Sequence, residues 1–545
     1  MTGTMAGMQV ARRRREGTAL LLKAFALVCA LVSAPTLGQT VSNQTEAAGG
    51  RSISFGTTTI DGTQWQRLAV RPEIPLGKLA VALDVELFIN EQGGISSKGW
   101  EFGNSTEIFS TVYRKIYYVR YGQARDPVFV KVGALDDVTL GYGLIMSHYR
   151  NTLDYPGVKN LGLQFELNPI LGMNVQGMMN SFMDINNGGP VVGVRAAKPW
   201  GKFEVGGTFV YDFDQFGGMT DRDGDGVPDV VDRFPKDGGK WADTDRDGIA
   251  DEVDRDADGD GKIDIDFGGK VLDRRQRDQI DSIMANTGLT PFEWDSLDGT
   301  HRQTPFNKNA VGRDPFGMVG FDAAFKLIDR PNLSLAAYGQ IGFSLDNGDG
   351  HRAEGWGLAA PGLRLIMGPL TGRIEYRHLR NEFQPEYFDR LYDHTRAVAS
   401  FDSGTVRTKD STLDTLSGQS LNGIFGDVGL SLGNYVRFDG QYQYLRGSRS
   451  QQRLVSIAAI DKAALSMVPK LSRVEAFYSK DNIGLYGDSF FERTIDTMYG
   501  YRVGFALGGG VEVLWSTQWL FQPVGSDPTE VRPTRQVNVE TVVRF

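Results

Sequence analysis

The chain has 545 residues, of which 41% are apolar and 11% aromatic, and its formal net charge is -9. Its mean hydropathy of -0.28 suggests a water-soluble protein, but a membrane barrel alternates lipid-facing with polar residues, so this average does not exclude one. Beyond the N-terminal segment no stretch has the ~18 uninterrupted apolar residues of a spanning helix, which excludes a helical membrane protein.

The N-terminal segment, residues 1–38, is typical of a cleaved export signal. Four arginines, Arg12–Arg15, precede an apolar run over 19–32, and the favoured cut follows Gly38. A twin-arginine signal is an alternative, but the rest of that motif is missing. The only cysteine, Cys29, lies in the apolar run, so the mature protein is expected to have no thiol chemistry.

Alternation with a period of two residues recurs along most of the chain after this signal. Segments 78–90, 203–213, 333–343 and 536–545 each carry apolar residues on one face and mostly polar or small residues on the other. Segments of about ten residues with a single apolar face are what a tilted membrane-spanning strand requires. A soluble β-sandwich or propeller also alternates, so the connections between strands must decide.

Short turns alternate with long polar connections. Long connections are expected at 91–110, 214–317, 381–421 and 522–534. Short turns are expected at Ile74–Lys78, Gly122–Pro127, Asn168–Leu171, Pro199–Lys202, Ile328–Asn332, Met367–Thr371, Gly433–Tyr435, Val468–Ser472 and Gly508–Gly510. This rhythm favours an all-β fold, a transmembrane antiparallel β-barrel of about 18 strands (range 16–20) with a long, largely irregular extracellular insert. An early strand near 52–60 would bring the count to twenty. The barrel is expected to consist of 39–213 and 318–545.

The insert, 214–317, differs in character from the barrel. Residues 221–266 hold seventeen acidic and seven basic side chains, a balance of -10, so this segment accounts for the charge of the whole chain. Aspartates recur at fixed positions in three units within 221–267, and glycine stands at the sixth position of each. Oxygens at positions 1, 3 and 5 converge when the chain coils tightly, glycine permits the sharp turn, and positions 7, 9 and 12 complete a cage of hard oxygen ligands suited to Ca²⁺.

The spacing predicts three Ca²⁺ sites, with a backbone carbonyl at position 7 of the first two. The third unit is partial, because Phe267 stands where its last carboxylate would be. The expected ligands are Asp221, Asp223, Asp225, Val227, Asp229 and Asp232; Asp243, Asp245, Asp247, Ile249, Asp251 and Asp254; and Asp256, Asp258, Asp260 and Asp264.

An EF-hand also fits these loops, but its flanking helices are absent. Instead, the linkers Arg233-Phe234-Pro235-Lys236-Asp237 and Trp241-Ala242-Asp243-Thr244-Asp245 resemble those of thrombospondin type-3 repeats, in a cysteine-free form. That resemblance implies a compact string of Ca²⁺ sites with little regular structure. An ordinary solvated acidic run is the alternative. Downstream, 271–286 could form a short amphipathic helix within the same insert.

Catalysis has little support, and no enzyme is expected. The histidines are scattered along the chain and match no catalytic motif: His148, His301, His351, His378 and His394. His378 is expected to face the lumen as a polar residue. Charged strand residues are expected to line the lumen and tune ion selectivity; they are Arg114, Lys115, Arg120, Arg373, Glu375 and Arg377.

The last strand ends on Phe545 and resembles the sorting signal of bacterial outer-membrane barrels. The resemblance implies a bacterial outer-membrane location and recognition by the barrel-assembly machinery. Other expected partners are outer-membrane lipid, lipopolysaccharide and further copies of the chain in a homo-oligomer, but no nucleic acid. The favoured function is a porin-like channel for passive diffusion of small hydrophilic solutes, with a calcium-ordered extracellular loop. The alternative is a barrel-anchored surface protein whose calcium-binding loop mediates adhesion or envelope interaction.

Overall fold

A computed structural model describes residues 52–544 apart from internal gaps. The longest gaps are 90–110, 153–159, 265–271, 295–304 and 346–354, and the others span four residues or fewer. The expected export signal, Arg114 and the terminal Phe545 lie outside the described residues. Among the helices in the described part of the chain, none has the length and hydrophobicity needed to cross a membrane.

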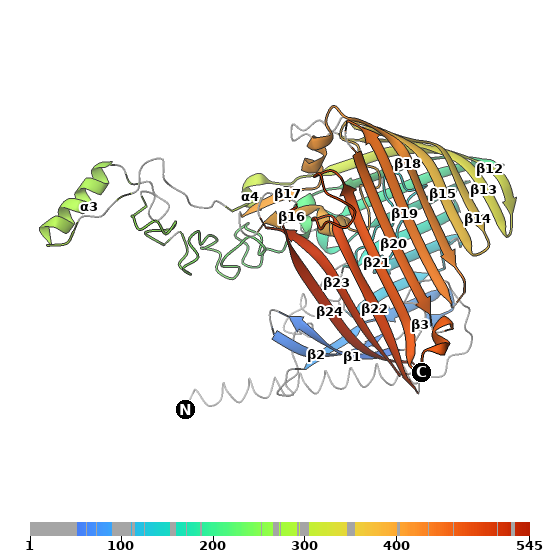
Figure 1. The fold of residues 1–545 in the computed structure, drawn as a ribbon, viewed down its shortest axis with the longest axis horizontal. Coiled ribbons are helices and arrows are strands. Elements are labelled where there is room, and N and C mark those ends of the chain that lie inside the picture. Colours follow the sequence, from blue (N-terminus) through green and yellow to red (C-terminus); the bar gives the residue numbers. More distant parts are fainter. Residues whose placement is uncertain are drawn as a thin grey trace.

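Strands dominate the structure (Figure 1). The N-terminal strands are β1 (Ser52–Ile60), β2 (Thr63–Arg71), β3 (Glu73–Leu76), β4 (Leu79–Leu83), β5 (Val85–Ile89), β6 (Ile116–Tyr121), β7 (Val128–Gly133), β8 (Gly162–Ile170), β9 (Met173–Met179), β10 (Val191–Trp200) and β11 (Phe203–Asp212). The later strands are β12 (Phe316–Arg330), β13 (Leu333–Ser344), β14 (Trp356–Met367), β15 (Leu370–Arg380), β18 (Ser420–Ser431), β19 (Val436–Gly447), β20 (Ser450–Asp461), β21 (Leu471–Ile483), β22 (Thr497–Gly508), β23 (Val511–Pro523) and β24 (Val531–Arg544).

These strands form one antiparallel 22-stranded sheet in which chain neighbours pair with each other. β2 and β3 are interrupted only at residue 72, and β4 and β5 only at Asp84. Each of these pairs acts as one strand, because β2 pairs with β5 and β3 with β4. Counted this way the described sheet has twenty strands, the upper end of the predicted range. β1 pairs with β2 on one side and with β24 on the other, with Ser52 opposite Arg544.

Burial on the strands is the reverse of that in a soluble protein. Outward side chains are large and apolar, for example Phe203, Phe321 and Ile374, which are 53–57% exposed. Inward side chains are often polar and buried, for example Arg195 on β10 and Arg377 on β15, the strand of Ile374. Exposed apolar surface of this extent requires a lipid environment. The fold is therefore a transmembrane antiparallel β-barrel, as the alternating pattern predicts.

Short turns gather at one end of the barrel, here called the turn end, and most long connections leave the other, the loop end. Eight of the nine predicted short turns join consecutive strands at the turn end. The ninth, Val468–Ser472, covers only the last part of a longer connection, 462–470, which contains a short helix over Ala464–Met467. The alternation is less strict than predicted, because two connections at the loop end, 61–62 and 448–449, are just as short. Hairpins of this kind leave β1–β2 and β19–β20 without an outer loop.

Helices are short and lie in the connections. They are η1 (Met183–Ile185), η2 (Gln215–Gly218), α3 (Arg274–Asn286), α4 (Lys308–Val311), α5 (Tyr392–Thr395), η4 (Asp410–Leu416) and η5 (Ala464–Met467). The helix expected over 271–286 is confirmed as α3, which has no buried residue. Figure 1 shows α3 and the acidic repeats projecting away from the loop end, while α4 lies close to the barrel.

Two long connections turn inward and fill part of the lumen. We name them lumen loop A (134–161, described apart from 153–159) and lumen loop B (381–419, described apart from 401–403). Loop B contains α5, η4 and a hairpin of β16 (Ala397–Ser400) and β17 (Thr405–Thr408). Aromatic and aliphatic residues of both loops share a core with inward side chains of the strands. Gly320 on the inner wall makes room for this core, because a Cβ there would lie 2.7 Å from Ile145 Cδ1.

The prediction that His378 faces the lumen is wrong. On β15, Arg373, Glu375 and Arg377 point inward and are largely buried, as predicted for these charged residues. Since neighbouring residues of a strand face opposite sides, His378 lies on the outer face. There its ring lies 5.2 Å from the ring of Trp356. An aromatic neighbour near a strand end is typical of the interfacial girdle of a membrane barrel.

Candidate metal centres and the lumen network

The three acidic repeats fold alike, although they share only their aspartate and glycine positions. We define them as repeat 1 (221–232), repeat 2 (243–254) and repeat 3 (256–267, described to 264). In each, the first aspartate accepts a hydrogen bond from the amide of the sixth residue, a glycine, at 2.9, 3.3 and 3.0 Å. These glycines have φ values of 95°, 92° and 87°, a conformation that side chains disfavour.

Two further hydrogen bonds recur in every repeat. The aspartate at position 5 accepts from the amide at position 7, at 2.7–2.8 Å. The aspartate at position 9 accepts from the amide at position 2, at 2.8–2.9 Å. The carboxylates at position 9 (Asp229, Asp251 and Asp264) therefore hold the loop closed. Asp251 also accepts from the Thr244 hydroxyl, which leaves this residue less free to bind a metal than predicted.

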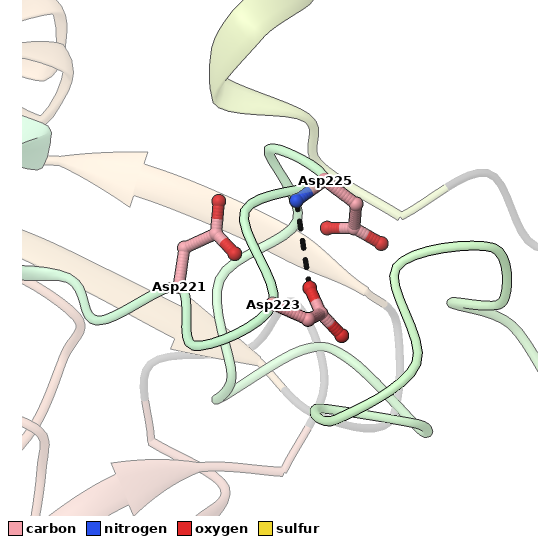
Figure 2. A group of neighbouring side chains, drawn as sticks. All are labelled: Asp221, Asp223 and Asp225. Carbon is pink, nitrogen blue, oxygen red and sulfur yellow. Dashed lines mark hydrogen bonds between the residues drawn. The ribbon is translucent and has the colours of Figure 1, made fainter.

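Carboxylates at positions 1, 3 and 5 converge in each repeat, as the spacing predicts. In repeat 1 these are Asp221, Asp223 and Asp225 (Figure 2). Within each trio, one oxygen from every carboxylate lies within 4.8 Å of the others. The other two trios are Asp243, Asp245 and Asp247, and Asp256, Asp258 and Asp260.

Repeat 1 has the most buried carboxylate oxygens without a hydrogen-bond partner. The Oδ2 atoms of Asp223, Asp225 and Asp232 are buried and have no hydrogen-bond partner. Asp232, at position 12, is 3% exposed. Burial raises the pKa of Asp232 to about 6, and the charges of Asp225, Asp223 and Asp229 add to this effect. Unpartnered carboxylate oxygens that repel one another fit a hard divalent cation, whose preferred ligands are such oxygens.

Repeats 2 and 3 show the same feature in weaker form. Asp243 Oδ1 and Asp256 Oδ1 are buried without a hydrogen-bond partner. Asp254, at position 12 of repeat 2, is close enough to contribute to a raised pKa of Asp245, for which burial is the main cause. Val227 and Ile249 occupy position 7, where the backbone carbonyl is the expected ligand. The residues present thus fit Ca²⁺ at all three repeats.

Inside the barrel, a network of charges ties loop B to the wall. Glu386 of loop B lies 3.1 Å from the Arg377 guanidinium and 3.7 Å from that of Arg373, and it also pairs with Arg453. Burial alone would raise the pKa of Glu386, but the guanidinia of Arg453, Arg377 and Arg373 bring it down to about 2. Glu386 is therefore an anion at every physiological pH. It anchors loop B against β15 and β20.

Loops A and B also bind each other. Met146 and Phe388 form a parallel β-bridge, and the Glu386 amide donates to the Leu144 carbonyl at 2.7 Å. The Tyr149 hydroxyl of loop A donates to Asp393 of loop B at 2.9 Å. Burial raises the pKa of Asp393 to about 7; the nearby Asp184 and Asp212 add to this, whereas Arg396 and the Tyr149 hydroxyl oppose it. The two loops thus constrict the lumen as one unit.

Sequence reasoning predicted the repeats and several wall residues, but it missed the lumen loops. Residues 134–161 carry no motif, and the sequence predicts only a long irregular connection at 381–421. The one available signal was composition. Phe383, Tyr387, Phe388 and Tyr392 place four aromatic side chains within ten residues of a loop that was expected to face water. Aromatics at such density need a surface to pack on.

No family model matches the chain, and no curated protein matches it. Solved structures match over most of its length. OpdQ of Pseudomonas aeruginosa has 7% identity and a TM-score of 0.28, covering 91% of this chain and 95% of its own. OccK11 (OpdR) of P. aeruginosa has 9% identity and a TM-score of 0.29, with coverage of 91% and 95%. Wzi of Escherichia coli, an outer-membrane carbohydrate-binding barrel involved in group 1 capsule assembly, has 10% identity and a TM-score of 0.31, with coverage of 92% and 85%. The strand pairing and the inverted burial carry the barrel assignment for this chain.

Proposed function

We propose that this protein is a porin-like channel of a bacterial outer membrane, through which small hydrophilic solutes diffuse passively. The observation that carries the proposal is the charged part of the inner wall, where buried arginines, lysines and carboxylates lie beside the apolar core that loops A and B share with the strands. A barrel of this many strands encloses a lumen wide enough for an aqueous path. Lumen loops A and B narrow that path and supply paired charges at the constriction, which favours selective passage of small charged or polar solutes.

Calcium has a structural role in this proposal. Repeats 1, 2 and 3 would hold Ca²⁺ through the carboxylates at positions 1, 3 and 5 and the carbonyl at position 7, and repeats 1 and 2 also through the carboxylate at position 12. The bound ions would neutralise carboxylates that otherwise repel one another, and so keep the projecting insert ordered. In this arrangement the loop end, with its repeats, faces the cell exterior and the turn end faces the periplasm.

Planar-bilayer recording of the purified full-length protein tests the channel. We expect discrete conductance steps, and a larger step for Glu386→Gln, because removing one partner of a buried ion pair costs roughly 3–5 kcal/mol and loosens loop B. Uncompensated guanidinia should also shift the current towards anions. Glu382→Gln is the matched control, since it removes the same charge from the same loop and should leave conductance unchanged.

Two results of this recording would contradict the proposal. One is a silent bilayer with protein shown to be folded by heat-modifiable migration. The other is an identical response of the Glu386→Gln and Glu382→Gln variants, which would mean that loop B does not constrict the path.

A second candidate is a surface-binding protein that uses the barrel as an anchor. It is favoured by the projection of the repeats and α3 away from the barrel (Figure 1) and by the packing of loops A and B inside the lumen. A silent bilayer together with Ca²⁺-dependent binding to lipopolysaccharide vesicles would support this function over the channel.

A further inference from the structure

Repeat 1 forms hydrogen bonds with the segment that returns from the insert to the barrel, and we call this contact the dock. The Lys308 amide donates to the Gly226 carbonyl at 2.7 Å. The Asn307 side-chain amide donates to the Asp225 carbonyl at 3.3 Å. The carbonyls that accept these bonds belong to positions 5 and 6 of the loop, and their orientation is set by the coil that gathers the carboxylates.

The segment 306–308 also forms a direct hydrogen bond with lumen loop B. The Phe306 amide donates to the Gly404 carbonyl at the tip of the β16–β17 hairpin, at 2.7 Å. Lys308 Nζ lies 3.0 Å from Asp214 Oδ2, which is fully buried where the insert leaves β11. The rings of Phe216 and Phe306 lie 4.7 Å apart and join the two ends of the insert. Phe306 and Lys308, which are separated only by Asn307, therefore hold the hairpin and repeat 1 together.

The β16–β17 hairpin is connected through Lys409 to the charged residues that tie loop B to the barrel wall. At its base, the Lys409 amide donates to the Arg396 carbonyl at 2.9 Å. Lys409 Nζ donates to the Tyr387 carbonyl at 2.7 Å and lies 3.7 Å from Asp389, which pairs with Arg453. A small cavity of about 40 Å³ borders the hairpin on the side of Tyr486 and Pro523.

We propose that Ca²⁺ at repeat 1, and not at repeats 2 or 3, holds the β16–β17 hairpin in the lumen and so controls the width of the path. Without the ion, the repelling carboxylates of repeat 1 uncoil the loop, and the Asp225 and Gly226 carbonyls no longer meet Asn307 and Lys308. The hairpin tip then loses its support. This inference rests on the proposed calcium binding and channel function.

Two glycines provide a matched pair of variants. A Cβ at Gly226 would lie 2.6 Å from Asn307 Oδ1, so Gly226→Ala strains the coil and also blocks the dock. Gly248, at the same position of repeat 2, has nearly the same φ but nothing within 4 Å of its added Cβ, so Gly248→Ala imposes the strain alone.

A third variant leaves the calcium loop untouched. The Asn307 side-chain oxygen caps α4 by accepting from the Asn309 and Ala310 amides. Asn307→Asp keeps this cap and replaces only the donor to Asp225 with an oxygen that repels the carbonyl. Because binding couplings are reciprocal, this variant should also weaken Ca²⁺ affinity at one site, although Asn307 is not a ligand.

The test measures a distance in full-length protein reconstituted in lipid, with spin labels on Val311→Cys and Arg407→Cys in a Cys29→Ser background. Both labelled positions are exposed. We expect a narrow distance distribution in Ca²⁺ that broadens in chelator, for the parent and for Gly248→Ala. For Gly226→Ala and Asn307→Asp we expect a broad distribution even in saturating Ca²⁺. Bilayer currents of these two variants should lose their response to Ca²⁺.

A distribution that ignores chelator in the parent would overturn the inference, as would Gly226→Ala and Asn307→Asp both behaving like Gly248→Ala. These failures are distinct from failure of the proposed function. Absent conductance with an intact calcium-dependent distance would refute the channel and leave the docking established.

Discussion

Buried ionisable side chains determine how the lumen loops respond to solution conditions. Asp393 is the clearest case, since it bridges loops A and B through Tyr149 and has a pKa near 7. A carboxyl whose pKa is raised in the folded state is favoured in its protonated form there. Stability from this group is complete below about pH 4 and is lost as pH rises towards 7.

We therefore predict that Asp393→Asn removes a pH dependence from the loops. In the wild-type protein, hydrogen-exchange protection of loops A and B, corrected for intrinsic rates, should fall between about pH 4 and pH 7 and level off above this range. The Asn variant keeps an acceptor for the Tyr149 hydroxyl and should stay protected throughout. Arg396, Asp184 and Asp212 face the same group, but they are present in both proteins and so do not account for a difference between the two.

His148 needs its own control, because it is a further ionisable side chain of loop A. It lies on loop A beside Asp137, at 2.9 Å. His148→Gln should keep the wild-type fall in protection. If that variant abolishes the fall and Asp393→Asn does not, the assignment to Asp393 is wrong.

At this scale the sequence revealed local patterns and hid distant ones. The aspartates of each repeat lie within twelve residues, so their spacing predicted the convergence that the structure shows. The partners of Glu386, by contrast, are Arg377 and Arg453, and the latter is 67 residues away along the chain. Only the closure of the barrel brings them together, and no spacing rule anticipates it.

Among the elements, the strands and turns were the most predictable, because alternation and tight turns depend on neighbours in sequence. Eight of the nine short turns and the helix α3 follow the prediction, whereas β20 and β21 are joined by a longer connection that contains η5. The prediction for His378 is wrong because polarity alone does not determine which face of a strand a residue occupies. The register of β15 places His378 on the outer face with Ile374 and Tyr376. The inward position of loops A and B was not predicted, because it depends on space at the inner wall, such as that at Gly320.

The repeats should behave as separable elements. We predict that deletion of residues 243–264 removes the calorimetric heat of Ca²⁺ binding to repeats 2 and 3 and retains that of repeat 1. The barrel should keep its heat-modifiable migration, because these repeats project from the loop end (Figure 1). No calcium heat from the full-length protein would refute calcium binding altogether, and a misfolded deletion variant would show that the repeats support the barrel.

For the whole molecule, the inverted burial makes a prediction that separates a membrane barrel from a soluble β-protein. Ile374 lies in the middle of β15, is 53% exposed and faces outward. Ile374→Arg should destabilise the protein in lipid vesicles by up to about 2–4 kcal/mol, as a charge on the lipid face near the midplane does. Urea unfolding in vesicles measures this change.

Ile374→Ala provides the comparison, since it removes the side chain without adding charge and should cost less. Equal stability of the Arg variant and the parent would mean that this face meets water. The neighbouring Arg373 shows that the strand accepts a guanidinium on its other face, where Asp427 pairs with it at 2.5 Å.

The pairing of β1 with β24 has a consequence for how the molecule forms. These strands lie almost five hundred residues apart in the chain, so their contact carries the largest loop-closure entropy of any pair in the sheet. Until it forms, two strand edges with unpaired amides and carbonyls remain open, and neither edge is tolerated in hydrocarbon. Insertion into lipid and completion of the sheet must therefore occur together, as a late and slow step. A catalyst that shields both edges until they meet would accelerate that step more than any other.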